Sequence, residues 1–314
     1  MPEWLVERGI GETRSARIHA GEIVEARILL EAVEPAGSVL EGRLIETGIP
    51  SVAKVEGQQY LLPKGAPGVT EGSVVRIEVT REKIPGAEPW KRPLARLTDE
   101  APRPSQRLDA EVLPFPSAED RLEQAGWSDL IEEARSGIVR FEGGALRISL
   151  TPAMTLIDVD GRLPPFDLAV ASAVAAAQMI LRHGISGSIG IDLPTIAGKD
   201  QRQAVGEAID ANLPLPFERT AMNGFGFLQI VRARPRASTF ELAADRAPFE
   251  ARVLLRKVAM DRTGATCLVA HPSVSAVFER NAQWIEALAR QIGGEVTLRS
   301  DQSLPIHAGY AQNA

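Results

Sequence analysis

The sequence predicts an α+β protein with an N-terminal OB-like β-barrel, an α/β metal-binding catalytic core and a small C-terminal α+β module. Three observations support this fold class. Residues 1–97 are short β-branched runs separated by glycine or proline, and residues 118–245 alternate strand-like with helix-like segments. Residues 246–314 mix the two types again, and the proline-rich residues 98–117 are expected to be a linker.

The composition indicates an ordinary globular protein of a reducing compartment. The 314 residues are 44% hydrophobic and 24% charged, and 35 Lys and Arg against 41 Asp and Glu give a net charge of −6. That balance argues against nucleic-acid binding by the whole surface but permits a local basic face. The single cysteine, Cys267, excludes an intrachain disulfide and a multi-cysteine zinc site. The N-terminus lacks a basic signal region, and the apolar run 168–181 is too short and alanine-rich to span a bilayer. We therefore expect a cytoplasmic protein without a membrane partner.

The first hundred residues are expected to be all-β. The strand-like segments are "EWLVER", "EIVEARILL", "VLEGRLIE", "SVAKVEGQQYLL" and "SVVRIEVTRE". Small OB-like barrels commonly hold single-stranded nucleic acid with stacked aromatic side chains. Tyr60 is therefore a candidate RNA contact, together with Trp4 and Trp90. Because these aromatics are few, a barrel that only packs stays open as an alternative.

The middle of the chain alternates strands and helices. A hairpin, "GIVRF" with "ALRISL", is followed by the strand "MTLIDVD", the alanine-rich helix 166–184 and the strand "SGSIGIDLP". The helix "KDQRQAVGEAIDANL" and the strand "FGFLQIVRARPR" complete the core. In the last part we expect helix 246–262, strand 266–272, one amphipathic helix 274–294 and strand 295–301.

Two aspartates end neighbouring strands of this core. Asp158 and Asp192 each follow an isoleucine, are 34 residues apart (192 − 158) and have one helix between them. A right-handed crossover places both strand ends at one edge of the sheet, so the carboxylates can converge. Converging carboxylates repel unless a proton or a cation lies between them, and Mg²⁺ prefers such oxygen ligands. Two solvated aspartates at loop starts fit the same pattern about equally well.

The order of these segments resembles the catalytic core of the ribonuclease E/G family. The likeness is carried by "EGGALRISLTPAMTLIDVDGR", the helix ending "ILRHG", "SGSIGIDL" and "FGFLQIVRARPR", over residues 130–237. Residues 1–96 resemble the family's opening strands and OB-type RNA-binding domain more weakly. The resemblance implies that Asp158 and Asp192 are catalytic, magnesium-binding residues. It also implies hydrolysis of single-stranded RNA by an endonucleolytic cut that leaves a 5′-phosphate and a 3′-hydroxyl.

Basic residues near the core are the expected RNA contacts. Arg232 and Arg234 match arginines of the family's strand, and Arg236 follows them. Residues 216–262 hold nine Arg or Lys against five Asp or Glu, a local excess of +4 (9 − 5). Lys199 and Arg202 begin the helix after the second acidic strand and are candidate phosphate contacts, with a solvated first turn as the structural alternative.

The sequence differs from the family pattern at three places, and each difference leads to a prediction. Asp160 stands where the family has asparagine, so it is either a third catalytic ligand or a charge that repels substrate. The segment that carries the family's 5′-monophosphate pocket is missing, so we expect no 5′-end sensing. The paired zinc cysteines are also missing, and Cys267 lies in the wrong context to replace them. A zinc-linked tetramer is not expected, and a homodimer stays open.

Two histidines, His183 and His271, are expected to have structural roles. His183 ends the alanine-rich helix, where the helix dipole explains it better than acid–base catalysis does, and His271 is expected to cap or pack. The sequence thus predicts a Mg²⁺-dependent endoribonuclease that acts in RNA processing or decay. An RNA-binding protein with the same core and little cleavage is the main alternative. A protein without RNA affinity would need the arginines of residues 232–236 to be held in ion pairs.

Overall fold

The computed structural model describes residues 3–85 and 91–313, which form a mixed α+β fold. The chain divides into two compact units, each assembled from separate stretches of sequence. Unit 1 comprises Met1–Ala32, Asp109–Ile131 and Leu242–Ala314, and unit 2 comprises Val33–Leu108 and Glu132–Glu241.

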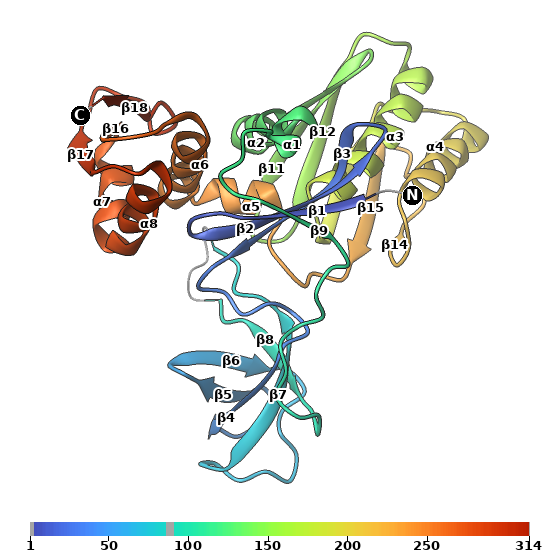
Figure 1. The fold of residues 1–314 in the computed structure, drawn as a ribbon. Helices are drawn as coiled ribbons and strands as arrows, with labels where there is room; N and C mark the ends of the chain where they lie inside the picture. The colour runs from blue at the N-terminus through green and yellow to red at the C-terminus, as the bar shows by residue number, and fades with distance from the viewer. Residues whose placement is uncertain (1–2, 86–90, 314) are drawn as a thin grey trace. The chain divides into compact units, whose positions relative to one another are not determined.

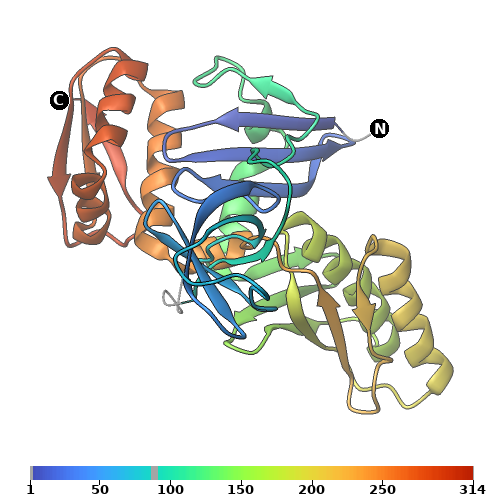
Figure 2. The ribbon, with the colours of Figure 1, turned by 90° about the horizontal axis from the view of Figure 1, so that it is seen from below.

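The first three strands of unit 1 form a sheet of their own instead of joining the barrel. Strands β1 (Glu3–Arg8), β2 (Glu12–His19) and β3 (Glu22–Leu30) pair antiparallel, as the blue strands of Figure 2 show. β9 (Glu111–Leu113) adds to the free edge of β1 in parallel register and gives the order β3-β2-β1-β9. The expected β-rich segment 1–97 therefore contributes to two separate sheets. The expected linker supplies one strand, because the edge of β1 otherwise leaves backbone groups unpaired.

The C-terminal part of unit 1 is the α+β module that the sequence predicts (Figure 1). Helix α6 (Arg246–Asp261) follows the short α5 (Thr239–Ala244), whose first residues belong to unit 2. The sheet β17-β16-β18 packs with α7 and α8 around an apolar cluster that includes Leu255, Leu268, Phe278 and Leu288. The remaining elements are β16 (Thr266–Ala270), α7 (Pro272–Arg280), α8 (Ala282–Ile292), β17 (Val296–Ser300) and β18 (Tyr310–Asn313).

Two details of this module differ from the prediction. The single amphipathic helix expected over residues 274–294 is split in two at Asn281, which has φ −127° and ψ 55° and ends one helix while preceding the next. The side chain of Asn281 donates to the carbonyl of Val277 at 2.8 Å, which favours a stop at this position. Strand β18 was not predicted from the sequence, and it pairs antiparallel with β16.

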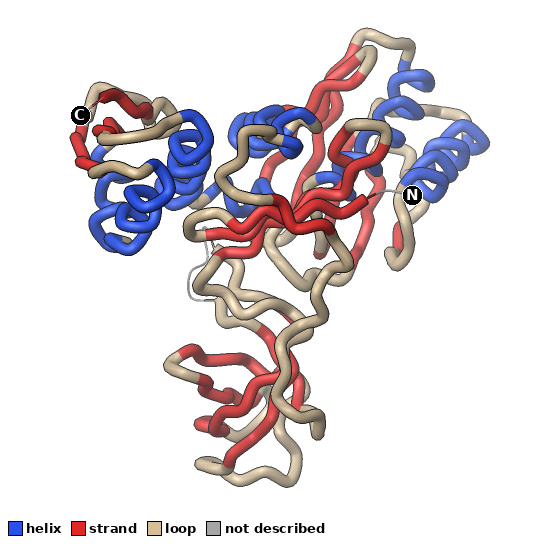
Figure 3. Tube along the Cα trace, viewed as in Figure 1, coloured by secondary structure: helices blue, strands red, loops and turns tan. Residues whose placement is uncertain are grey.

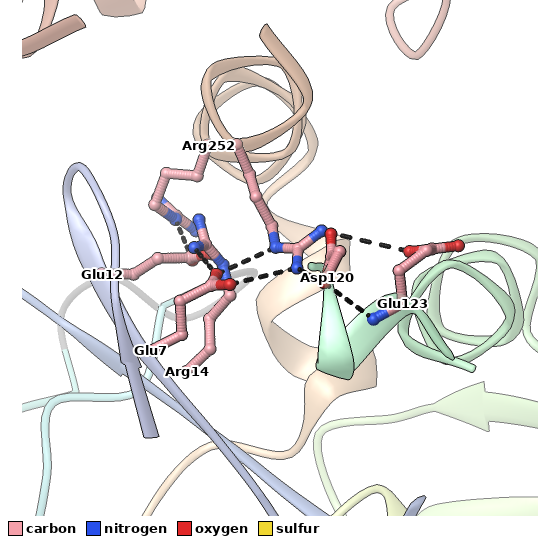
Figure 4. Close-up of polar contacts among 7 residues, drawn as sticks. Glu7, Glu12, Arg14, Asp120, Glu123 and Arg252 are labelled. Carbon is pink, nitrogen blue, oxygen red and sulfur yellow. Dashed lines mark hydrogen bonds and ion pairs between the residues drawn. The ribbon is translucent and has the colours of Figure 1, made fainter. Parts of the chain in front are cut away.

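A buried network of ion pairs joins the three stretches of unit 1 (Figure 4). Arg14 on β2 donates to Glu7 at 2.6 Å and to Glu12 at 2.8 Å. Arg252 on α6 donates to the other oxygen of Glu12 at 2.8 Å. Arg256 donates to Glu7 at 2.9 Å and to Asp120 at 2.8 Å. Arg256 also lies 4.0 Å from the more exposed carboxylate of Glu123, so each of the three buried cations has a carboxylate partner, as costly burial of charge requires.

The network also begins a helix. Asp120 is the N-cap of α1 (Arg121–Gln124), and its carboxylate accepts a hydrogen bond from the backbone N–H of Glu123 at 2.9 Å. α2 (Trp127–Ser136) follows and crosses from unit 1 into unit 2. Burial alone would lower the pKa of Arg256, but its hydrogen bonds to Glu7 and Asp120 raise that pKa above its ordinary value. Arg256 therefore stays charged.

Unit 2 contains the closed five-stranded barrel that the sequence predicts. Its strands are β4 (Val39–Glu46), β5 (Ser51–Val55), β6 (Gln58–Leu62), β7 (Val74–Arg81) and β8 (Leu94–Leu97), in the order β4-β5-β6-β8-β7. Alternate side chains point inward, and Leu44, Leu62 and Ile77 are almost fully buried. Gly42 is required on β4, because a Cβ there would lie 2.4 Å from the carbonyl oxygen of Lys54.

The second part of unit 2 is a six-stranded sheet with helices on one face (Figures 1 and 3). Its order is β10-β11-β12-β13-β15-β14, and β12 runs parallel to β13 through the crossover helix α3, as predicted. The strands are β10 (Ile138–Phe141), β11 (Gly144–Leu150), β12 (Thr155–Gly161), β13 (Gly187–Asp192), β14 (Glu218–Arg219) and β15 (Phe227–Arg232). The helices are α3 (Pro165–Arg182) and α4 (Lys199–Asn212).

Helix α3 is a core helix of this layer. Within the described residues it is the one helix whose length and composition would let it cross a bilayer. Its buried residues form a stripe at helical spacing that packs inside the α/β core. They are Leu168, Ala169, Ser172, Ala173, Ala176, Ala177, Met179 and Ile180.

We expect Arg256→Met to lower the free energy of unfolding by about 3 kcal/mol, because it leaves buried carboxylates without their partner. Lys257→Met, one residue further on the exposed side of α6, is the matched control and should change that free energy by less than about 0.5 kcal/mol. Urea unfolding followed by circular dichroism measures both. Equal unfolding midpoints for the two variants would show that the network does not stabilise unit 1.

Candidate functional site

Asp158 and Asp192 are direct register partners on the parallel strands β12 and β13. Neighbouring strands lie about 4.8 Å apart, and register partners point to the same face of a sheet. Ile157 and Ile191, the residues before them, are 1% and 0% exposed, whereas both aspartates are exposed. The isoleucines thus fill the face under the helices, and the two carboxylates project side by side from the open face.

Two carboxylates at this spacing suit a magnesium ion that takes its other ligands from water or phosphate. Among the residues that the structure describes, no three or more His, Cys, Asp or Glu side chains gather into a group that could hold a metal ion. Any donor set at this edge is therefore limited to the aspartate pair, because Asp160 does not form a three-residue group with it and is paired with Arg147. Magnesium binding at Asp158 and Asp192 stays a prediction.

Asp160 projects from the same face and is held by an arginine. Arg147 on β11 is the register partner of Asp158, and its Nε donates to Asp160 Oδ2 at 2.5 Å. The hydrogen bond to Asp160 raises the pKa of Arg147 above its ordinary value, and the charges of Asp160 and Asp158 add to this. Both partners are more than half exposed. Arg147 was missed in the sequence, although the hairpin that pairs "ALRISL" with "LIDVD" carried the signal.

The row of register partners ends in an aromatic side chain. Phe227 on β15 is the partner of Asp192. Its ring lies across Gly190, where a Cβ would come within 2.5 Å of the ring and 3.0 Å of Leu156. Phe227 therefore packs on the open face of the sheet beside the carboxylates, and glycine at position 190 leaves it room.

Lys199 and Arg202 begin the helix that follows Asp192, as the sequence predicts. Lys199 is exposed in the first turn of α4. Arg202 Nη1 donates to the carbonyls of Ile196 at 2.8 Å and Ala197 at 2.7 Å, so it fastens the loop between β13 and α4. Both residues belong to the edge of the sheet where Asp192 ends its strand, and Lys199 is the one with an exposed charge.

The arginines of β15 are not brought to the aspartates. Arg232 pairs with Gly187 at the start of β13, whereas Asp192 at its end pairs with Phe227. Arg232 is five residue steps from Phe227, which places this arginine about 17 Å along the strand from the carboxylates. Arg232 donates to the carbonyl of Ile185 at 3.2 Å.

Two further arginines lie on the segment that follows. Arg234 forms an ion pair with Glu241, and Arg236 is partly buried. Arg232, Arg234 and Arg236 therefore lie away from the aspartate pair, and their predicted contact with RNA stays a prediction.

Tyr60 lies inside the barrel. Its side chain is 3% exposed among the core residues, and burial, with the charges of Glu34 and Glu56, raises its pKa to about 12. Its ring faces are thus covered, which corrects the expectation that Tyr60 stacks on RNA. Trp4 belongs to unit 1, with the Arg27 guanidinium 4.6 Å from its ring centroid, and Trp90 lies outside the described residues.

The barrel surface carries a basic pair that the sequence did not reveal. Arg43 on β4 and Lys54 on β5 are direct register partners, and both are exposed. Like charges placed directly opposite each other destabilise a sheet, and Arg43 also donates to the carbonyl of Gly72 at 3.0 Å. Val74, which is 56% exposed, is the register partner of Arg43 on β7, and Gln59 is the register partner of Lys54 on β6. These four residues form a row across the barrel surface. The row is a candidate phosphate-contacting surface of the barrel.

His183 is a structural residue of the core. It is 1% exposed at the end of α3, with Nδ1 2.6 Å from Thr239 Oγ1 and Nε2 2.9 Å from Glu133 Oε2. In the neutral form, Nε2–H donates to the carboxylate and Nδ1 accepts from the hydroxyl. Burial lowers the pKa of His183, although its hydrogen bond to Glu133 opposes this. His271 is the N-cap of α7 and accepts from the Ser273 N–H at 3.2 Å, so the predicted capping role is confirmed.

No family model matches this sequence, and no curated protein is significantly similar to it. The resemblance to the ribonuclease E/G family therefore stays a prediction that depends on the segments quoted above.

The lowered pKa of His183 predicts a pH dependence of stability. The unfolded chain takes up a proton near pH 6.5 and the folded chain only at lower pH, so this contribution is complete above pH 6.5 and falls as the pH decreases. We expect the stability advantage of the wild type over His183→Gln to shrink by up to about 1.4 kcal/mol per pH unit below that value. Urea unfolding between pH 8 and pH 5 tests this, with exposed His307→Gln as control. A constant difference across that range would contradict it.

Proposed function

We propose that this chain is a magnesium-dependent endoribonuclease that hydrolyses single-stranded RNA and leaves a 5′-phosphate and a 3′-hydroxyl. The observation that carries the proposal is the register pairing of Asp158 with Asp192 on adjacent parallel strands, with both carboxylates exposed on one face. Phosphodiester hydrolysis needs negative charge neutralised at the phosphate and a water oriented for attack. An exposed carboxylate pair that holds a hard cation meets both needs.

The proposed division of labour follows from these positions. A bound Mg²⁺ would polarise the phosphate and make a coordinated water a better nucleophile. Asp158 and Asp192 would hold that ion, and Arg147 reduces the negative charge of the edge by pairing with Asp160. Lys199 is the exposed cation nearest in sequence to Asp192 at the same edge.

Single-stranded RNA is the proposed substrate because of the barrel. Closed five-stranded barrels of the OB type bind single strands through basic grooves on their outer surface. Arg43 and Lys54 form an exposed pair of cations on such a surface. With Tyr60 buried, the barrel would act on RNA through phosphate contacts more than through base stacking.

The alternative is an RNA-binding protein that does not cleave. Two observations favour it: Arg234 is engaged by Glu241, and Arg232 lies at the far end of β15 from the aspartates. In this alternative the core would be a binding platform, and the barrel would supply most of the affinity.

Cleavage of a labelled single-stranded RNA separates the two functions. We expect magnesium-dependent cleavage by the wild type, none in EDTA, and a loss of at least about 100-fold in rate for Asp158→Asn and for Asp192→Asn. Asp261→Asn, an exposed aspartate at the end of α6, is the matched control and should cleave at the wild-type rate. Magnesium-dependent cleavage that survives in the double variant would refute the proposed site. Binding without any cleavage by the wild type would establish the alternative.

We expect substitutions of the two partners of the Arg147–Asp160 ion pair to have opposite effects on RNA affinity. Asp160→Asn removes one negative charge and releases Arg147 for phosphate, so binding should become a few-fold tighter in low salt. Arg147→Met leaves three carboxylates without their cation, so binding should become a few-fold weaker. Fluorescence anisotropy at two salt concentrations measures both, and the difference should shrink as the salt concentration rises. The same affinity in both variants would exclude this edge from RNA contact.

A further inference from the structure

Phe225 is the most exposed large hydrophobic side chain of the described residues, at 85%. It lies in the connection between β14 and β15 (Figure 1). A phenylalanine ring left in water forgoes the stabilisation that burial would give, and no packing role in the fold accounts for its position. Leu215, which precedes β14, is also exposed, at 78%, but its aliphatic side chain has no planar face on which a base could stack.

The backbone under Phe225 is held firmly. The side-chain oxygen of Asn223 accepts hydrogen bonds from the N–H groups of Phe225 at 2.9 Å and Phe227 at 3.0 Å. The hydroxyl of Thr195 donates to the carbonyl of Phe225 at 3.3 Å. Hydrogen bonds to the N–H and to the carbonyl of Phe225 hold its backbone and so fix the direction of its Cα–Cβ bond. The ring is therefore presented on a fixed loop, as a binding platform requires.

This loop is locked to the strand that carries Asp192. The N–H of Leu193, the residue after Asp192, donates to the carbonyl of Gly226 at 3.1 Å. Gly226 has φ +98°, and a Cβ there would lie 2.1 Å from the carbonyl oxygen of Leu193, so no other residue fits. Phe225 thus adjoins the segment that leaves the acidic edge of the sheet.

The distance from Phe225 to the carboxylates suits a nucleotide that flanks the reacting phosphate. Phe227 is the register partner of Asp192, and two residues of chain span at most roughly 7 Å. Phe227 itself is occupied by packing across Gly190, whereas the ring of Phe225 is open. An exposed planar ring beside a phosphate site is the arrangement by which proteins bind single-stranded nucleic acid without sequence preference.

We infer that Phe225 is the stacking platform for one unpaired base of the RNA whose phosphate lies at Asp158 and Asp192. This inference rests on the proposed function, because it assigns a position on the same substrate. It makes Phe225 a substrate-positioning residue, and it predicts tolerance of any base at the stacked position, since every base has a π-face.

Binding of a short labelled single-stranded RNA in EDTA tests the inference without cleavage. We expect Phe225→Ala to bind about 10-fold more weakly than the wild type, within the range of a lost base–aromatic stack, and Phe225→Trp to retain wild-type affinity. Leu215→Ala, an exposed apolar residue in the connection between α4 and β14, is the matched control and should bind as the wild type does. Circular dichroism should show that all variants fold, because both side chains are exposed.

Two readouts identify stacking itself. Emission from Phe225→Trp, corrected for the other four tryptophans by subtracting the wild-type signal, should be quenched by RNA. A single abasic position moved along the RNA should weaken wild-type binding at one site and leave Phe225→Ala unaffected there.

Equal RNA affinities of wild type and Phe225→Ala, with no quenching, would overturn the inference while leaving the proposed nuclease intact. A wild type that binds no RNA at any salt concentration would overturn both.

Discussion

The register between β12 and β13 is the constraint on which the rest of the site depends. A strand that slips by one residue exchanges its two faces. In this sheet the slip would expose Ile157 or Ile191, which are almost fully buried, and would force an aspartate under the helices. The cost of burying an unpaired carboxylate therefore fixes the pairing of Asp158 with Asp192. The crossover helix α3 makes the strands parallel, so the two carboxylates meet at one edge.

The same sheet divides its charges between two edges. At the end of β13 lie Asp158, Asp160 and Asp192, and Arg147 pairs with Asp160, so these four groups together carry a net charge of −2 (three negative, one positive). At the start of β13 lies Arg232, which donates to the carbonyl of Ile185, the residue that leads from α3 into that strand. Arginines at one edge thus support the chain path, whereas the other edge keeps unsatisfied negative charge, which is the condition for holding a cation.

The sequence predicted those features that depend on neighbours in the chain. Alternating polarity was enough for the barrel and for the β12-α3-β13 crossover, and Gly and Pro marked the turns between them. The assembly of unit 1 could not be predicted in this way, because its ion pairs join residues such as Glu7 and Arg256 that are 249 positions apart. The burial of Tyr60 was missed for a related reason: an alternating strand does not tell which face of a barrel is inside. Arg147 could be found only by pairing two strands in register.

The ion pair between Arg147 and Asp160 bears on the choice between a nuclease and a binding protein. Both side chains are more than half exposed, so the pair contributes little stability and is screened by salt. A guanidinium in such a pair exchanges a carboxylate for a phosphate at small cost, since its planar fork of N–H donors can bind two oxygens of either group. If RNA binds at this edge, as we propose, Arg147 can leave Asp160 for a phosphate. The separation of Arg232 from the aspartates favours a non-catalytic protein, whereas the exposed charge of Lys199 at the start of α4 favours phosphate binding near Asp192.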